Sequence, residues 1–163
     1  HAADRALFAS SSCGICGKES IDRVVLKAPP LNTSLKVPTR CILRLPESLR
    51  KAQDVFNQTG GLHAAALFDS KGQLTVLRED IGRHNAVDKV IGWQLSKEQL
   101  PINNRGLLIS GRAGFEITQK ALMAGIPMIV SVGAPSSMAV SLATNSGMTL
   151  IGFLRNGRFN QYA

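Results

Sequence analysis

The sequence predicts an α/β domain with a mostly parallel, mixed sheet that helices cover on both faces, in a three-layer α/β/α arrangement. Three observations favour this class. The chain has 163 residues, of which 44% are hydrophobic, and this is enough for one core. Segments with helical periodicity alternate along the chain with short apolar runs. These runs are uninterrupted by polar residues, as in strands that are buried on both faces.

The first part of the chain predicts a loop and then a helix. Residues 28–38 are rich in turn formers and have no helical period, so they separate an N-terminal segment (1–45) from the main domain (46–163). A helix is expected over Pro46–Phe56, because proline suits a first helical turn and the apolar side chains of this segment share one face. The glycines that follow would end it.

The remaining elements are expected in the order β-β-α-β-α-β-α-β. Two apolar runs around a turn at Asp69–Gly72 predict a hairpin. Turns that contain glycine or proline separate the later segments. The expected strands are His63–Phe68, Leu74–Leu77, Leu107–Ile109, Met128–Val132 and Thr149–Leu154, and the expected helices are Asn85–Leu95, Phe115–Ala124 and a segment through Ala139–Ala143.

Composition narrows the classes of function. The formal net charge is +8, which fits either a solvated basic surface or an anionic partner. Aromatic residues make up only 5% of the chain, which argues against binding to single-stranded nucleic acid through base stacking. No apolar run is long enough to span a membrane. Three cysteines, an odd number, favour a reducing cytoplasm over a disulfide framework. Because the chain starts at His1 and no signal peptide is evident, we expect a fragment or a processed product.

Three of the expected loops between a strand and a helix are polar and rich in glycine: Arg78–Asn85, Ser110–Glu116 and Gly133–Ser137. Ligands of parallel α/β sheets bind where strands end and helices begin. Helix N-termini attract anions, and arginine adds paired hydrogen bonds to phosphate oxygens. Ordinary caps and turns are the alternative for each loop taken alone. The candidate ligand-binding residues in the first two loops are Arg78, Arg83, His84, Ser110, Gly111 and Arg112.

The end of the chain and the histidines leave further alternatives. Phe153–Asn160 places two arginines around a turn after the last expected strand, which is either a basic chain end or a clamp for a diphosphate or a guanine. His63 starts an apolar strand and is expected to pack. His84 lies among charged residues at a helix start, so it is the better candidate for acid–base chemistry or ligand contact.

Near the N-terminus, FASSSCGICG contains Cys13 and Cys16, a pair that suits zinc binding, redox cycling or sulfur transfer. A structural zinc site needs four ligands, and one chain has too few suitably spaced partners, although a zinc site shared across a dimer stays open. A redox dithiol prefers a helix N-terminus, whereas serines and glycines indicate a loop. A loop suits a thiol that carries sulfur as a persulfide between two sites. Cys41 lies in an apolar, strand-like run and is expected to be a structural thiol.

Five stretches of the chain resemble the formate dehydrogenase accessory sulfurtransferases. They are SSSCGICG, TGGLHAAALFD, REDIGRHNAVDKVIG, SGRAGFEITQKALMAGIPMIVSVGAPSSMAVSLA and GMTLIGFLRNGRFNQY. The resemblance extends from about Phe8 to the end of the chain. Members of that family have a further β-rich portion before the cysteine pair, which this sequence lacks.

The resemblance implies a sulfur carrier that formate dehydrogenase requires for activity. Cys13 would accept a persulfide sulfur from a cysteine desulfurase, with Cys16 assisting. The sulfur would then pass to the molybdenum (or tungsten) bis-molybdopterin guanine dinucleotide before the cofactor enters the catalytic subunit of formate dehydrogenase. The nucleotide-cofactor segment of the family corresponds here to Phe153, Leu154, Arg155, Asn156, Gly157 and Arg158. A homodimer would allow the sulfur-carrying loop of one subunit to reach the pocket of the other.

The resemblance also implies a cytidine-deaminase-like fold. Zinc deaminases place H-x-E at one helix start and P-C-x-x-C at the next. Here those starts read Arg83-His-Asn-Ala86 and Ser110-Gly-Arg-Ala-Gly-Phe-Glu116, so His84 is the one possible ligand and no structural metal is expected. Two other functions stay open. One is a chaperone that holds the cofactor without chemistry, and the other is a zinc-dependent, deaminase-like nucleotide hydrolase.

Overall fold

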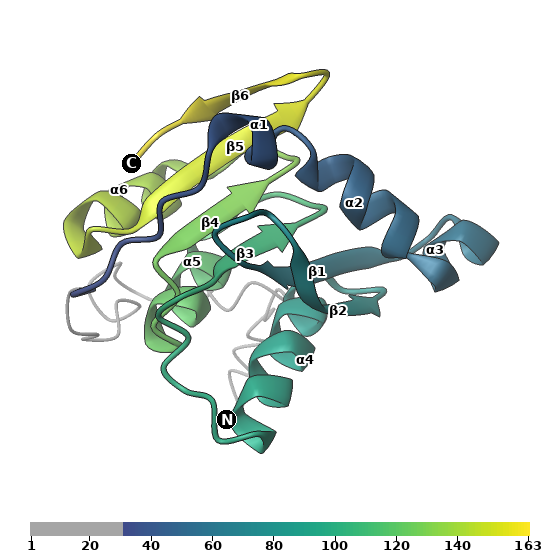
Figure 1. Cartoon of the computed structure of the whole chain (residues 1–163), viewed down its shortest axis with the longest axis horizontal. Helices are drawn as coiled ribbons and strands as arrows, with labels where there is room; N and C mark the ends of the chain where they lie inside the picture. The colour runs from purple at the N-terminus through teal and green to yellow at the C-terminus, as the bar shows by residue number, and fades with distance from the viewer. Residues whose placement is uncertain (1–30) are drawn as a thin grey trace, which may run out of the picture.

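The computed structural model describes residues 31–163, so Cys13 and Cys16 lie outside the described residues. The described part is an α/β domain (Figure 1). Its strands are β1 (His63–Phe68), β2 (Leu74–Asp80), β3 (Gly106–Ile109), β4 (Met128–Ser131), β5 (Thr149–Arg155) and β6 (Arg158–Gln161). Its helices are α1 (Thr39–Ile42), α2 (Leu45–Ala52), α3 (Asp54–Thr59), α4 (Arg83–Ser96), α5 (Phe115–Met123) and α6 (Ser137–Ser146).

The strands form one mixed sheet in the order β2-β1-β3-β4-β5-β6. β3 pairs with β4 and β4 with β5 in parallel, whereas the pairs β1–β2, β1–β3 and β5–β6 are antiparallel. Because β1 is antiparallel to both of its neighbours, β2 points in the same direction as β3, β4 and β5. Most of the described strands therefore end at one edge of the sheet, as the sequence predicted.

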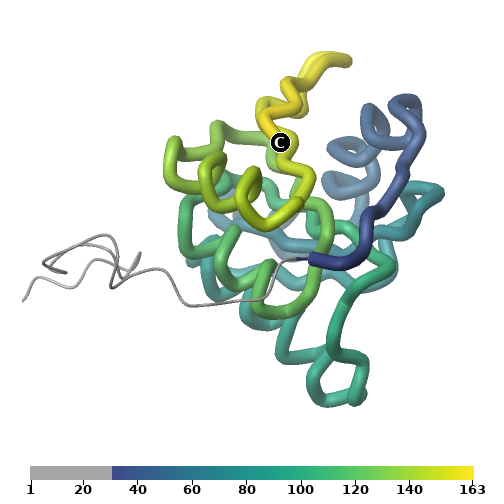
Figure 2. The backbone as a smooth tube through the Cα atoms, turned by 90° about the vertical axis from the view of Figure 1, so that its left-hand side faces the viewer, coloured from purple at the N-terminus to yellow at the C-terminus, as the bar shows by residue number. Residues whose placement is uncertain are grey.

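Helices cover both faces of the sheet, which confirms the predicted three-layer arrangement (Figures 1 and 2). One core lies between the sheet and α4, α5 and α6, where Val87, Ile117 and Ala143 are buried against strand residues such as Ile129. The other core lies under α1 and α2, where Leu45 and Leu49 pack with strand residues of the opposite face. In β1, β3 and β4, successive buried residues alternate between the two cores, as expected for strands that are covered on both faces.

The predicted helix over 46–56 is wrong in one respect, because it consists of two helices. α2 ends at Ala52, and Gln53 leaves the helical conformation with φ −88° and ψ 76° before α3 begins at Asp54. The carboxylate of Glu79, at the end of β2, accepts hydrogen bonds from the backbone N–H groups of Val55 (3.0 Å) and Phe56 (2.9 Å). This contact from a distant strand satisfies the amide groups that a helix start leaves free.

Two further elements differ from the sequence expectation. Residues 39–42 form the short helix α1. Cys41 is therefore half-buried in a helix, whereas the sequence predicted a strand-like segment. The arginine-containing end of the chain is a β-hairpin, in which β6 adds a strand at the edge of the sheet. Its Asn156–Gly157 turn has positive φ at both residues, 54° and 71°, which matches the two-residue hairpin turn that Asn-Gly favours.

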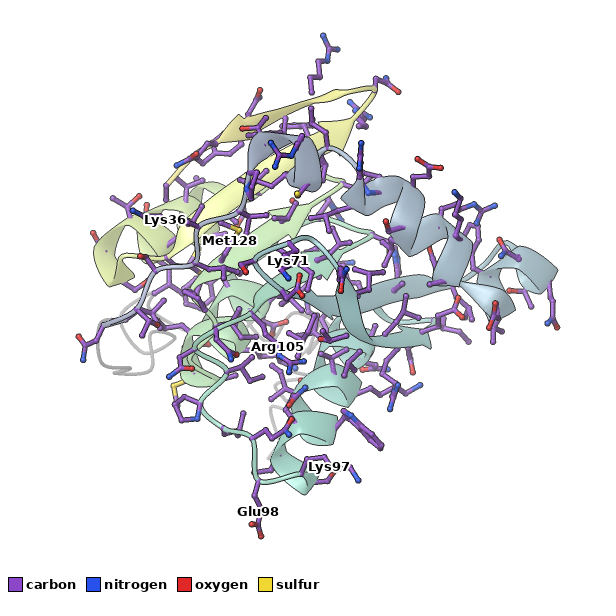
Figure 3. All side chains as sticks on the ribbon, viewed as in Figure 1. Lys36, Lys71, Lys97, Glu98, Arg105 and Met128 are labelled. Atoms are coloured by element: carbon purple, nitrogen blue, oxygen red, sulfur yellow. The ribbon has the colours of Figure 1, made fainter. Side chains whose placement is uncertain are left out.

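Charged side chains lie on separate parts of the domain, among them Lys36, Lys71, Lys97, Glu98 and Arg105 (Figure 3). Lys97 and Glu98, for example, lie at the C-terminal end of α4, away from the sheet edge where that helix starts. Within residues 31–163, no helix is sufficiently long and apolar to cross a membrane.

Candidate functional site

The edge of the sheet where β2, β3, β4 and β5 end is also where three helices begin. α4 follows β2, α5 follows β3 and α6 follows β4. The N-termini of these three helices therefore point toward one region. Each contributes a partial positive charge and free backbone N–H groups, which makes the region suited to an anionic ligand.

Backbone hydrogen bonds join the loops at this edge to one another. The N–H of Gly133 donates to the carbonyl of Gly111 (3.0 Å), and the N–H of Ala113 donates to the carbonyl of Ala134 (3.2 Å). The next strand joins in, since the N–H of Phe153 donates to the carbonyl of Gly133 (3.0 Å). The loops after β3 and β4 thus continue the pairing of their strands beyond the sheet.

Gly133 is required for this close approach. A Cβ atom at this position would lie 2.9 Å from the carbonyl oxygen of Gly111 and 3.0 Å from the Cα of Arg112. Both are backbone atoms, which cannot move without shifting the loop. The glycine therefore allows the two loops to touch.

A pocket of about 310 Å³ lies over the three helix N-termini, and we call it the edge pocket. It is lined by Arg83, His84, Arg112, Ala113, Gly114, Phe115, Glu116, Ala134, Pro135 and Ser136. The three predicted loops all contribute to it. The sequence therefore placed these loops correctly at a common edge.

Two arginines give the edge pocket its positive charge. Arg112 is exposed in the loop after β3, and Arg83 is the first residue of α4. The Nε of Arg83 is buried and has no hydrogen-bond partner, one of two such side-chain atoms in the part of the chain that the structure describes. A buried donor without a partner is costly, so a ligand acceptor at this position would stabilise the site.

His84 and Glu116 form a polar pair in the wall of the edge pocket. The His84 Nε2 lies 3.1 Å from a Glu116 carboxylate oxygen, and both side chains are largely buried. Burial lowers the pKa of His84 from its ordinary value, and the positive charges of Arg83 and Lys120 lower it further. The negative charge of Asp88 opposes this shift, but burial dominates. A neutral His84 can donate a hydrogen bond from Nε2 to Glu116, and the two side chains together can then act as an acid–base pair.

Asp80 holds the turn between β2 and α4. Its Oδ1 accepts hydrogen bonds from the Gly82 N–H (2.9 Å) and the Asn85 amide (3.0 Å), and its Oδ2 pairs with Lys89 at 2.6 Å. The hydrogen bond from Lys89, followed by those from Gly82 and Asn85, lowers the pKa of Asp80 to about 2. The carboxylate therefore fixes the start of the helix that carries Arg83 and His84.

Two predicted site residues, Arg78 and Ser110, lie elsewhere or have other partners. β2 extends to Asp80, so Arg78 is on the strand opposite Ala65, with its guanidinium 4.7 Å from the Trp93 ring centroid. Its side chain therefore packs along α4 in place of lining the edge pocket. The Ser110 hydroxyl accepts a hydrogen bond from the Ala64 N–H (2.9 Å) and extends the pairing of β1 with β3.

The hairpin of β5 and β6 brings Arg155 and Arg158 to the same edge of the sheet, where both are exposed. Leu154, which precedes Arg155, is buried in the core under α1 and α2, so its side chain does not face a ligand. Phe153 has a positive φ of 55°, uncommon for a bulky residue, at an irregularity in the strand pairing. The guanidinium of Arg155 lies 5.7 Å from the Phe153 ring centroid.

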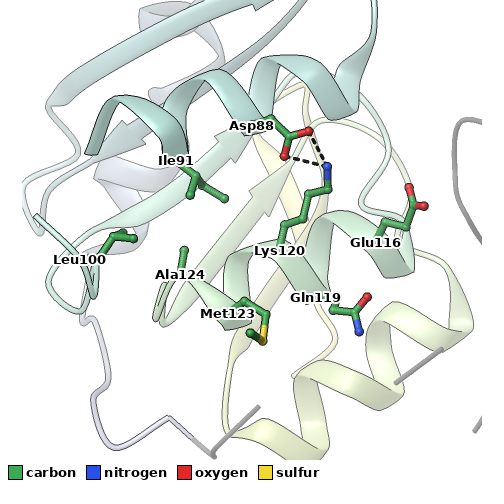
Figure 4. Close-up of a pocket in the computed structure, with 8 residues that line it drawn as sticks. All are labelled: Asp88, Ile91, Leu100, Glu116, Gln119, Lys120, Met123 and Ala124. Atoms are coloured by element: carbon green, nitrogen blue, oxygen red, sulfur yellow. Dashed lines mark hydrogen bonds and ion pairs between the residues drawn. The ribbon is translucent and has the colours of Figure 1, made fainter. Parts of the chain in front are cut away.

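Two other pockets adjoin the site. The α4–α5 pocket, of about 390 Å³, is bordered by an ion pair between Lys120 Nζ and Asp88 (2.7 Å) and shares Glu116 with the edge pocket (Figure 4). The α2–α3 pocket, of about 490 Å³, is lined by Arg50, Gln53, Phe56, Gly60, Gly61, Leu62, His63 and Ser110.

Sequence reasoning did not select Glu116, Gln53 or His63 as site residues. Glu116 stood in a loop that was singled out, but an acid in a first helical turn is ordinary. Gln53 gave no signal, because it is helix-compatible in a segment with helical periodicity. His63 was expected only to pack. It starts β1 and lies beside the loop after β3, since a Cβ atom built on Gly111 would be 3.4 Å from the Nδ1 of His63.

A family model described as the FdhD/NarQ family matches residues 1–163. The chain belongs to the FdhD/NarQ family. Relatives named "Sulfur carrier protein FdhD" include one from Mycobacterium bovis, 53% identical over 97% of this chain, and one from Streptomyces avermitilis, 51% identical over 98%. One from Thermoplasma acidophilum is 49% identical over 94%. The chain covers 58%, 58% and 54% of these three proteins, a little over half of their length.

Solved structures agree with membership of the FdhD/NarQ family and with the predicted fold. One is assigned as a formate dehydrogenase accessory protein from Desulfotalea psychrophila, with a TM-score of 0.72 and 35% identity over 83% of this chain and 57% of that one. Another is a guanine deaminase from Nitrosomonas europaea, with a TM-score of 0.55 and 15% identity over 74% of this chain and 79% of that one. The second likeness shows the fold alone, and it supports the deaminase-like class.

The FdhD/NarQ chain presents a different donor set from that of a zinc deaminase at the corresponding helix starts. His84 faces Glu116 there, and the stretch Ser110–Glu116 at the start of α5 contains no cysteine, in contrast to the P-C-x-x-C of zinc deaminases. Among residues 31–163, no three His, Cys, Asp or Glu side chains gather as potential metal ligands.

Proposed function

We propose that this FdhD/NarQ chain carries sulfur that formate dehydrogenase requires for activity. The observation that carries the proposal is the match, over 97% of this chain, to relatives named as sulfur carriers. The matched family region includes Cys13 and Cys16. Because the chain spans only a little over half of these relatives, the activity of the whole protein is part of the proposal.

Cys13 would be the acceptor of the sulfur, as a persulfide sulfurtransferase requires. Its thiolate attacks the outer sulfur of a persulfide on a cysteine desulfurase, the S–S bond breaks and the desulfurase thiolate leaves. Cys16 can then accept the sulfur as a relay. Alternatively, its thiolate attacks the inner sulfur, which releases sulfide and leaves a Cys13–Cys16 disulfide that a dithiol reductant must restore.

The edge pocket is the proposed destination of that sulfur. Its substrate would be the molybdenum bis-molybdopterin guanine dinucleotide, which carries two diphosphates. Arg83 and Arg112, the three helix N-termini and the unpartnered Nε of Arg83 suit such an anion. Arg155 and Arg158 of the hairpin would hold another part of the same molecule. We further propose that the protein acts in the cytoplasm as a homodimer. It would deliver the cofactor to the catalytic subunit of formate dehydrogenase.

Intact-mass analysis tests the sulfur carrier. The 163-residue chain is incubated with a cysteine desulfurase and cysteine, and we expect a gain of one sulfur mass that a reductant removes. Cys13→Ser should abolish the gain. Cys41→Ser is the matched control, because Cys41 lies in helix α1 and should leave the gain unchanged. A full gain in Cys13→Ser would refute the assignment of Cys13.

Complementation separates the carrier from a chaperone that only holds the cofactor. Cys13→Ser, placed in the full-length protein, should fail to yield active formate dehydrogenase in cells that lack the native gene. Full dehydrogenase activity with that variant would favour the chaperone instead.

A further inference from the structure

The α4–α5 pocket has an apolar floor that the sulfur carrier proposal does not use. Its cavity of about 390 Å³ is lined there by Ile91, Leu100, Met123 and Ala124 (Figure 4). Met123 is 55% exposed, and Leu100 also belongs to the exposed large apolar residues of the domain. Exposed apolar side chains that gather around a cavity mark a surface on which another apolar group docks.

The pocket lies in a groove between two helices that run in the same direction. α4 and α5 both start at the same edge of the sheet, where the His84 Nε2 lies 3.1 Å from Glu116. One turn further along both helices, Lys120 Nζ lies 2.7 Å from Asp88. The apolar floor follows about one turn beyond this ion pair. At its polar end the groove adjoins the edge pocket, because Glu116 lines both.

A second cavity continues the groove past Met123. This Leu31 pocket has a volume of about 290 Å³, and its lining includes Leu31, Pro101, Leu122 and Met123. Met123 borders both cavities, so its flexible thioether side chain can adapt to an occupant of either. The three spaces therefore form one series along α5, from the Leu31 pocket through the α4–α5 pocket to the edge pocket.

The chain enters the described part of the structure at one end of this series. The N–H of Leu31 donates to the carbonyl of Ser146 at the end of α6 (3.1 Å), so the point of entry is fixed at the Leu31 pocket. An extended chain spans about 3.3–3.6 Å per residue, so residues 23–26 can lie up to about 17–29 Å from Leu31. The α4–α5 pocket extends about 10 Å along α5 from Met123 to Glu116. The whole pocket is therefore within reach of these residues.

The sequence before Leu31 contains a segment that matches the groove. Residues 23–27 read Arg-Val-Val-Leu-Lys, three adjacent aliphatic residues between two cations. The aliphatic side chains suit the apolar floor. The cations suit the charge of the pocket, whose lining has two acidic side chains, Asp88 and Glu116, and one basic side chain, Lys120. Because the net charge of the whole chain is +8, this balance is local, and it favours a basic apolar segment over an acidic one.

We propose that the α4–α5 pocket is the docking site of residues 23–27 of the same chain. The three aliphatic residues of this segment occupy the apolar floor beside Met123, and Arg23 lies toward Glu116. A tethered segment needs little intrinsic affinity, because a linker as short as residues 28–30 gives it an effective concentration in the millimolar range. A second copy or another protein lacks this advantage.

Docking of this segment also guides the cysteine pair. With Arg23 at the Glu116 end of the groove, residues 17–22 alone link Cys16 to a point that adjoins the edge pocket. These residues span up to about 20 Å when extended. The guidance of the thiols rests on the proposed function, whereas the docking itself does not require sulfur transfer.

Disulfide trapping in the 163-residue chain tests the docking. Cys13, Cys16 and Cys41 are replaced by serine, and Val25→Cys is combined with Met123→Cys. In a glutathione buffer, the ratio of intramolecular disulfide to dithiol measures the effective concentration of the two thiols. We expect this effective concentration to be at least about tenfold higher than that of a control pair outside the groove.

The control pair combines Val25→Cys with Asn145→Cys. Asn145 is exposed on α6 beside Ser146, the residue that holds Leu31. A segment that moves freely on its tether would therefore meet positions 123 and 145 to a similar extent, whereas a docked segment meets position 123. Similar effective concentrations for the two pairs would overturn the docking. A disulfide between two chains would also overturn it, and would assign the pocket to a second copy.

A further change separates docking from chance contact. Val24→Asp together with Leu26→Asp should lower the effective concentration of the pair at positions 25 and 123 about tenfold, because charged side chains do not enter an apolar floor. Ser20→Asp, outside the segment, is the matched control and should leave it unchanged. An unchanged value for the double substitution would contradict the docking. Sulfur loading of Cys13 is measured on the chain with its native cysteines, so failure of one proposal leaves the other standing.

Discussion

The edge pocket and the α2–α3 pocket share one end of the sheet but are built in different ways. The edge pocket is made of short loops after parallel strands, and main-chain hydrogen bonds through Gly133 and Ala113 join these loops. The α2–α3 pocket is made by a break between two helices, and one acid, Glu79, supports that break. The first pocket is charged and closely packed, whereas the second combines an amide, an aromatic ring and open space around Gly61. The difference teaches that strand order alone can bring loops together into one pocket, while the other pocket needs a break in regular helical structure.

The largest expected effect compares one glycine from each pocket. Gly133→Ala would place a Cβ against backbone atoms at 2.9–3.0 Å, so we expect a loss of about 2 kcal/mol in the free energy of unfolding. In Gly61→Ala the added Cβ would meet no atom within 4 Å, so the free energy of unfolding should change by less than about 0.5 kcal/mol. Urea denaturation measures both. Similar losses for the two variants would remove the proposed difference in packing between the pockets.

The next effect compares one arginine from each pocket. Arg112→Gln removes a cation from the edge pocket, and we expect inorganic pyrophosphate to bind about tenfold more weakly, as for one charge-assisted hydrogen bond. Arg50→Gln changes a cation that stacks on Phe56 in the other pocket, so pyrophosphate affinity should stay as it is. Calorimetric titration provides both affinities. If Arg50→Gln weakened pyrophosphate binding as much as Arg112→Gln, phosphate would not be specific to the edge pocket.

The smallest effect concerns pH. The pKa of His84 is lowered in the folded protein by burial, then by Arg83 and Lys120, so the unfolded chain takes up a proton at higher pH than the folded chain does. The stability of the folded protein should therefore fall as the pH drops below about 6.5, the ordinary pKa of histidine, and further until the lowered pKa is passed. His84→Gln should show a shallower fall of the urea midpoint between about pH 7.5 and about pH 5.5 than the unchanged protein. Parallel curves would mean that His84 does not contribute.

The contrast between the pockets also marks how far the sequence could predict the structure. Apolar runs and helical periods gave the order of the elements, and that order placed the loops after β2, β3 and β4 at one edge. The order of the elements did not predict the helix break at Gln53, because that break is supported by hydrogen bonds to Glu79, which lies far along the chain. Arg78 was misplaced for a related reason, since pairing with β1 extends β2 to Asp80 and turns Arg78 toward Trp93. Local pattern does not determine either contact.

The last strand was missed on different grounds. Asn156–Gly157 is a hairpin turn by composition, but the residues after it alternate weakly, so a basic chain end or a ligand clamp was expected there and no strand. Pairing with β5 makes them a strand and sets the exposure of Arg155 and Arg158. Leu154, next to Arg155 in the chain, belongs to the core by the alternation of the strand. The pairing register of β5 and β6 has to be known before the exposed arginines can be told apart from the buried leucine.

The main-chain pairing of the loops after β3 and β4 has a consequence for how such sites diversify. Since Gly111, Gly133 and Ala134 hold the loops through backbone groups, the side chains that face the ligand contribute little to the architecture. Residues such as Arg112 can then be exchanged without dismantling the scaffold. A guanine deaminase with this fold at 15% identity shows that the same framework can be built from a largely different set of side chains.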